Sequence, residues 1–214
     1  MKCRSNVFLV VILLTLCFTV SGCASNDTLS KSSKLTVDSA NKSGETEITK
    51  SDFDVSYHEI ILNDKTPLSE LSTKLQIPID EDNENVAIKA AGIVNKNHYS
   101  WYQVTYPNKA NPDLILEYLY NKTLKKGRII SIDLKKVHTI RGMQVGDHLD
   151  KLKQVYGNNM NEEYNSEITN SYSFKLGNYY AYFIIEKKSG KISEIHYDFD
   201  SNKAMKEMDI ASFD

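Results

Sequence analysis

Cysteine is scarce in this chain of 214 residues and is confined to its beginning. The three cysteines are Cys3, Cys17 and Cys23, so the sequence beyond position 23 carries no thiol. That excludes disulfides, thiolate metal ligands and cysteine nucleophiles from any domain that follows. An excess of charge of one sign is missing too. The 26 Lys+Arg and 28 Asp+Glu give a formal net charge of −2, and this balance does not favour a nucleic-acid partner.

The sequence also lacks the motifs of several enzyme classes. There is no Gly-x-Ser-x-Gly and no glycine-rich phosphate loop, so no catalytic residue is indicated and an enzyme is the less favoured class. The five histidines show neither HExxH nor HxH spacing, and we therefore expect no metal and no cofactor. Two carboxylates brought together by folding would leave no signature, so a cell-envelope hydrolase stays open as the alternative function.

The first 23 residues have the organisation of an export signal. Lys2 and Arg4 precede an apolar run over residues 7–20, which at ~1.5 Å per residue is too short for a bilayer core of ~30 Å. The run ends in Val20-Ser21-Gly22-Cys23, which resembles the lipobox of bacterial lipoproteins. A plain secretory signal or an uncleaved anchor are the alternatives.

The lipobox resemblance implies a location. In that family residues 1–22 would be removed as a signal peptide, and the Cys23 thiol would carry diacylglycerol. The two acyl chains of that group, such as palmitate, provide the two signals that stable anchoring requires. The chain is thus expected at the cell membrane, lipid-anchored and facing outside the cytoplasm. Residues 23–52, the lipidated cysteine and a polar stretch without sustained hydrophobic period, are predicted to be a disordered tether.

The rest of the chain predicts an α+β fold, in which helices pack on one face of antiparallel sheet. The first unit, residues 53–136, combines a short strand over residues 57–62 with a helix that begins at Thr66-Pro67. Four alternating runs with turn residues between them then predict a meander. These runs cover residues 86–94, 99–106, 114–120 and 129–134.

The second unit, residues 137–214, follows the same order and ends in a C-terminal tail. Asp147 is predicted to cap a helix that Gly157 ends. Strands are predicted over residues 171–176, 179–186 and 192–199. The repeated order suggests two tandem helix-plus-meander units, and duplication and chance both stay open as explanations.

A second resemblance rests on the stretch from Thr139 to Gly157. Its pattern of Gly142, an apolar residue, Gly146-Asp147, a helix and Tyr156-Gly157 resembles the opening of small envelope lipoproteins and of beta-lactamase-inhibitor-protein-like domains. The resemblance implies a helix packed on an antiparallel sheet and a role in binding or assembly. It implies no catalytic residue.

Strand alternation nominates a binding surface. If Phe183 and Tyr197 face the helix, the opposite face carries their strand neighbours, and Trp101 could join it. The candidate residues are Tyr180, Tyr182, Glu194, His196 and Trp101. Such a tyrosine-rich face suits an extracytoplasmic protein or glycan, whereas ordinary sheet packing is the alternative. The sequence therefore indicates a lipid-anchored binding or envelope-assembly module, with a hydrolase or a simple spacer as rivals.

Overall fold

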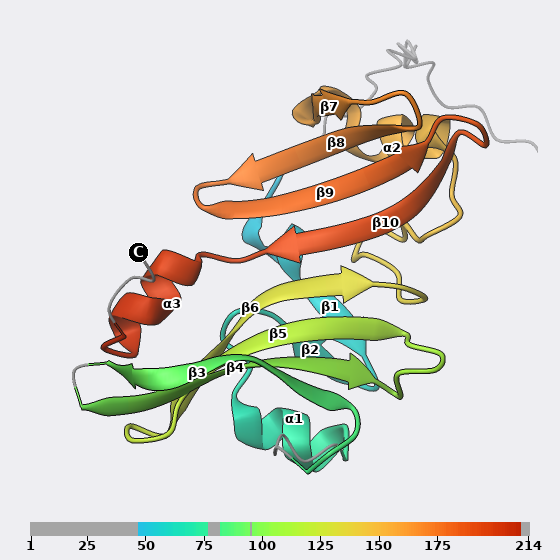
Figure 1. Cartoon of the computed structure of the whole chain (residues 1–214). Helices are drawn as coiled ribbons and strands as arrows, with labels where there is room; N and C mark the ends of the chain where they lie inside the picture. The colour runs from blue at the N-terminus through green and yellow to red at the C-terminus, as the bar shows by residue number, and fades with distance from the viewer. Residues whose placement is uncertain (1–46, 77–81, 95, 211–214) are drawn as a thin grey trace, which may run out of the picture. The chain divides into compact units, whose positions relative to one another are not determined.

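The computed structural model describes residues 47–76, 82–94 and 96–210 (Figure 1). The predicted signal peptide, Cys23 and the predicted tether as far as residue 46 lie outside the described residues. The helical elements are η1 (Lys50–Phe53), α1 (Leu68–Lys74), α2 (Leu149–Tyr156), η2 (Gly157–Asn159) and α3 (Ser201–Glu207). The strands are β1 (Val55–Tyr57), β2 (Ile60–Leu62), β3 (Val86–Val94), β4 (Asn97–Tyr106), β5 (Leu114–Asn121), β6 (Lys126–Leu134), β7 (Asn161–Asn165), β8 (Thr169–Leu176), β9 (Tyr179–Glu186) and β10 (Lys191–Asp198).

Eight of the strands form one antiparallel sheet in the order β3-β4-β5-β6-β10-β9-β8-β7. Two four-stranded meanders, each preceded by a helix, therefore meet edge to edge. The seam between them is the antiparallel pairing of β6 with β10, from Ile195 opposite Leu134 to Asp198 opposite Ser131. Figure 1 shows β6 and β10 side by side in the middle of the sheet. Residues that are distant in sequence come together at this seam.

One face of the sheet, the core face, carries the main hydrophobic core. Alternate residues of the strands point into it, as the burial of Phe183, Ile195 and Tyr197 shows. From α2, Tyr156 stacks on Phe174 with the ring centroids 4.8 Å apart. The same cluster includes side chains of the β1–β2 hairpin and of α1, so both meanders share one core. Burial of each large side chain contributes about 2–3 kcal/mol.

The helices do not all pack on one face, and the expectation is corrected on this point. Met208 and Ala204 of the α3 region form a smaller cluster with Leu119 and Ile130, whose side chains lie on the face opposite the core. The Asn121 side-chain amide donates to the carbonyl oxygen of Met208 at 2.7 Å, which holds the end of α3 against β5. We call this second face the open face, because α3 covers only part of it.

Two boundaries near the start of the fold differ from expectation. The predicted strand over residues 57–62 is a hairpin, in which His58 and Glu59 form a two-residue turn with φ of 45° and 64°. This turn lacks the Asn and Gly that two-residue hairpin turns usually contain, so the sequence did not predict it. The end of the predicted tether is ordered, since η1 begins at Lys50 and the Asp52 side chain is buried. An ion pair between the buried Asp52 and Arg141 holds this segment.

Candidate functional site

The open face contains a groove of about 580 Å³ near the middle of the sheet. Four of the five nominated residues line it, namely Trp101 from β4, Tyr180 and Tyr182 from β9, and His196 from β10. The fifth, Glu194, lies beside His196 on β10 with a carboxylate oxygen within 4.8 Å of a His196 ring nitrogen. Further lining side chains come from β5, β6 and the start of α3: Ile115, Glu117, Ile130, Ser131, Asp133, Asn178, Asp198, Phe199, Asp200, Ser201 and Asn202.

The period of the strands explains why these residues share a face. Ile195 and Tyr197 are buried in the core, so Glu194, His196 and Asp198 point the other way. Strand register then sets the neighbours. Tyr182 lies opposite His196, and Tyr180 lies opposite Asp198.

The two tyrosines form an ordered aromatic wall of the groove. Their rings stack with centroids 5.9 Å apart and an angle of 8° between the planes. The ring of His196 follows Tyr182 at 6.2 Å. Burial, followed by the negative charge of Asp198, raises the pKa of Tyr182, so its hydroxyl remains a proton donor at neutral pH. The wall combines a flat apolar surface with polar tips, as many protein-binding surfaces do.

His196 is held between two carboxylates. Its Nδ1 pairs with Oδ1 of Asp133 across the β6–β10 seam, and its Nε2 lies 2.9 Å from Oδ1 of Asp198. Burial alone would lower the pKa of His196, but the hydrogen bonds and charges of the two aspartates outweigh it and raise the pKa to about 10. The ring is therefore an imidazolium at neutral pH, and both nitrogens donate. An imidazolium cannot act as a general base there.

Trp101 lines the groove from β4. Its Nε1–H donates to Oε2 of Glu117 at 3.1 Å, and Lys89 lies 4.0 Å from the other oxygen of that carboxylate. The indole also packs against the cluster formed with α3. Trp101 thus both lines the groove and supports α3, a question that the sequence left undecided.

The groove is acidic, and sequence analysis missed this property. Glu117, Asp133, Asp198 and Asp200 line it together with a single imidazolium. Leu116 and Leu134 are buried in the core, so strand alternation places their neighbours Glu117 and Asp133 on the open face. The sequence could therefore have indicated which face carries these two carboxylates. What the sequence could not supply is the register of β6 against β10, which brings Asp133 next to His196.

A second cavity, of about 690 Å³, lies between α1, the β5–β6 turn and α3. Its basic side chains are Lys125, Lys126 and Arg128, and Arg128 is paired with Glu207. No residue that the sequence nominated lies here. We regard the open-face groove as the stronger candidate, because it combines aromatic and acidic groups.

Side chains of the stretch from Thr139 to Gly157 make contacts that stabilise the fold. Arg141 forms a two-pronged ion pair with the buried Asp52, including Nη2 to Oδ2 at 2.7 Å, and its guanidinium lies 5.1 Å from the ring of Tyr156. Burial would raise the pKa of Asp52, but hydrogen bonds from Arg141 and Thr49 hold it below its usual value. The pair fastens η1 to the loop before α2.

The helix limits in this stretch are partly as expected. The N-cap of α2 is His148, one residue later than predicted, and Asp147 instead accepts hydrogen bonds from the Gln144 amide and Lys151. The side chain of Asp147 is thus used by the preceding turn. Gly157 ends α2 as predicted, with a φ of 57° that suits glycine.

Comparison with known proteins supplies little. No family model matches the chain, and no curated protein matches it. Among solved structures, a cysteine-rich secretory protein from Staphylococcus aureus aligns with a TM-score of 0.38 and 10% identity, over 65% of this chain and 45% of that one. The chain therefore spans less than half of that protein. In the part of the chain that the structure describes, no helix has the length and apolar character needed to cross a membrane.

Proposed function

We propose that this protein is a lipid-anchored, extracytoplasmic binding module whose open sheet face recognises another protein through a basic side chain. The observation that carries the proposal is the groove of Trp101, Tyr180 and Tyr182 rimmed by carboxylates. Tyrosine and tryptophan are the residues that most often dominate protein interfaces. Carboxylates beside aromatic rings attract lysine or arginine through both ion pairing and the ring faces.

The charges around the groove favour a cationic partner group. Four carboxylates line it against the single charge of His196, and Asp133 and Asp198 are already engaged with that ring. Glu117, which accepts from Trp101 and lies 4.0 Å from Lys89, and Asp200 carry the other two negative charges of the lining. Asp200 accepts from the Asn178 amide at 2.9 Å and from the backbone of Lys203, so its position is fixed before a partner arrives. A preorganised acidic rim lowers the entropic cost of binding.

The location in the proposal rests on the sequence. Lys2, Arg4, the short apolar run and Val20-Ser21-Gly22-Cys23 agree in position with a lipoprotein leader. Replacing Cys23 by Ala should therefore move the protein from the membrane fraction to the medium or to an unprocessed precursor. The fraction is measured by immunoblotting. Unchanged retention, together with unchanged mobility, would contradict lipid anchoring.

We further propose that residues 53–136 and 137–214 are two copies of one helix-plus-meander unit. The order of a helix followed by four antiparallel strands occurs twice, and the last strand of each copy pairs at the seam. Gly127 and Gly190 stand at the same point, near the start of the last strand. On this account the groove lies where the two copies join.

Site-specific photocrosslinking in living cells tests the binding function. A benzophenone amino acid at position 182 should yield a discrete adduct with one envelope protein, because that side chain lines the groove. The matched control places the same probe at Tyr164, which is 64% exposed on the edge strand β7. No adduct at position 182, or equal adducts at both positions, would contradict a binding groove. An adduct sensitive to glycosidase instead of protease would assign the face to a glycan.

A further inference from the structure

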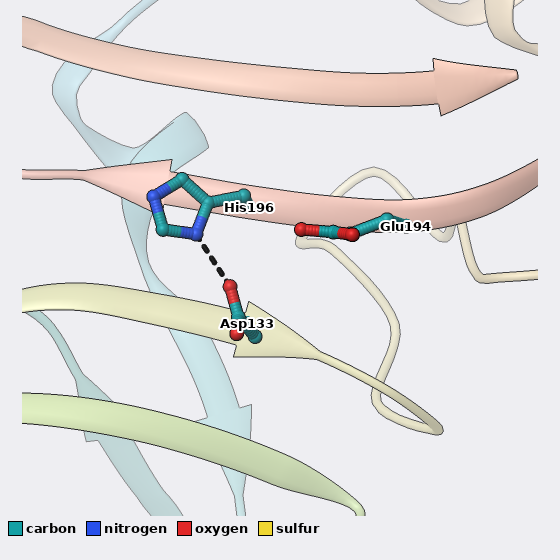
Figure 2. A group of neighbouring side chains, drawn as sticks. All are labelled: Asp133, Glu194 and His196. Atoms are coloured by element: carbon teal, nitrogen blue, oxygen red, sulfur yellow. Dashed lines mark hydrogen bonds and ion pairs between the residues drawn. The ribbon is translucent and has the colours of Figure 1, made fainter. Parts of the chain in front are cut away.

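A group of three potential metal ligands lies at the β6–β10 seam (Figure 2). Asp133 comes from β6, and Glu194 and His196 come from β10. Each offers one ligand atom, and these atoms lie within 4.8 Å of one another. Figure 2 shows the Asp133 carboxylate reaching towards the His196 ring, with Glu194 beside it on the same strand.

The orientation of His196 is the one that metal-binding histidines adopt. Its Nδ1 points to Asp133, and its Nε2 is hydrogen-bonded to Asp198 at 2.9 Å. A histidine that binds a metal through one nitrogen usually donates from the other to a carboxylate, which fixes the ring. Asp198 occupies that position, so the cluster is more than a group of acids.

Glu194 supplies the second, independent indication. Within the described residues its side chain makes no hydrogen bond and no ion pair, although it is partly buried and adjoins the Asp133–His196 pair. Its neighbours on the same face of β10 are engaged with each other. The cluster sets the carboxylates of Asp133 and Glu194 against one imidazolium, and a divalent ion in place of the proton on that ring would balance both negative charges.

We propose that Asp133, Glu194 and His196 bind a zinc-type divalent ion that bridges β6 and β10, with Asp198 as the positioning residue. One imidazole nitrogen and two carboxylate oxygens suit Zn²⁺, whereas Mg²⁺ and Ca²⁺ prefer oxygen ligands alone. In a tetrahedral zinc site the ligand atoms lie ~2.0–2.2 Å from the ion and therefore ~3.4 Å from one another. Side-chain rotations that move the ligand atoms by about 1 Å would bring the three into these positions. Binding replaces the proton on Nδ1, which passes to solvent. The three side chains would leave a fourth position for water.

The site has a structural consequence that needs no partner. The pairing of β6 with β10 joins the two meanders within the sheet. An ion held by both strands would fasten this seam and raise the midpoint of thermal unfolding. Binding of the ion is thus measurable apart from the proposed protein-binding function, and failure of either leaves the other standing.

The test is calorimetric titration of the full-length, chelator-treated protein with ZnCl₂ alone, with MgCl₂ and CaCl₂ in parallel. We expect one zinc ion per chain and no heat from the other two salts. Glu194→Gln should abolish the zinc heat while leaving the Asp133–His196 pair in place. His196→Gln removes that pair together with the nitrogen ligand and should abolish the heat as well. Asp198→Asn, which removes the positioning carboxylate, should weaken zinc binding ~10–100-fold.

Matched controls are available outside the cluster. Glu167→Gln and His98→Gln alter an exposed glutamate and an exposed histidine, and both should bind zinc as the unaltered protein does. Thermal unfolding without metal verifies that each variant is folded, and added zinc should raise the midpoint of the unaltered protein but not of Glu194→Gln. Absence of zinc binding in the unaltered protein would overturn the proposal. Equal binding by Glu194→Gln and Glu167→Gln would overturn it as well.

Discussion

The two faces of the eight-stranded sheet use the same residue type in different ways. On the core face, Tyr118 and Tyr197 are buried among leucine, isoleucine and phenylalanine. On the open face, Tyr180 and Tyr182 are partly exposed and stand beside carboxylates and an imidazolium. Around each of these tyrosines the period of two residues decides whether the ring packs in the core or lies on a surface available for contact. The number of tyrosines therefore does not indicate a binding role. The sheet face on which a tyrosine lies shows whether its side chain is available for contact.

The largest difference in stability between the two faces is expected for two neighbouring residues of β9, Phe183 and Tyr182. Phe183 is fully buried in the core, so Phe183→Ala should lower the free energy of unfolding by about 3–5 kcal/mol. Tyr182→Ala, one residue away on the open face, should lower it by about 1 kcal/mol. Chemical denaturation of the two variants measures both values. Equal losses would mean that the two faces contribute alike to stability.

A buried ion pair should contribute more to the free energy of unfolding than an ion pair on the open face. Arg141 and Asp52 are 15% and 3% exposed, so Arg141→Met leaves an uncompensated buried carboxylate and should cost about 3 kcal/mol. Lys135 lies 3.8 Å from Asp133 on the more solvated open face, and Lys135→Met should cost less than about 1 kcal/mol. Denaturation at neutral pH and moderate salt compares them. A larger loss of unfolding free energy in Lys135→Met than in Arg141→Met would contradict the lower contribution predicted for ion pairs on the open face.

A smaller effect concerns the imidazolium on the open face. The pKa of His196 is raised to about 10 by Asp133 and Asp198, so its contribution is fully present below the usual histidine pKa of ~6.5 and is lost as the pH rises through about 10. The free energy of unfolding should therefore exceed that of His196→Gln by about 1–2 kcal/mol at pH 6. The difference should shrink between pH 6.5 and 10.

Denaturation curves across that pH range check the prediction. Glu194 and Lys135 also face the pair and are present in both proteins, so the difference reports their interactions with the His196 charge together with those of Asp133 and Asp198. His98→Gln is the control, since that histidine is exposed and lies outside the groove. A difference that grows with rising pH would contradict the charged state of His196.

Much of the sheet follows from local pattern. The predicted strand over residues 86–94 coincides with β3, and that over residues 179–186 coincides with β9. Their limits are clear because turn residues stand on both sides of an alternating run. The faces of β9 and β10 also follow from alternation. By contrast, β7 was missed, because Asn161–Asn165 is polar and exposed throughout and shows no period.

The site required information that no local pattern holds. Asp133 and His196 are 63 residues apart in sequence, and only the pairing of β6 with β10 makes them neighbours. Helix α3 was read as a tail, although Asp200 caps it by accepting from the Lys203 amide, because seven residues give too short a hydrophobic stripe. Chain topology, more than residue type, thus defines the groove.

We propose that the open face binds a partner without being needed for folding. The most direct test combines Tyr182→Ala with His196→Gln in the full-length protein and measures affinity for the partner identified by crosslinking. We predict a dissociation constant at least ~30-fold higher, with the cooperative thermal transition retained. The control, Tyr164→Ala combined with His98→Gln, should bind as the unaltered protein does. Unchanged affinity of the Tyr182→Ala/His196→Gln protein, or loss of its thermal transition, would contradict the account.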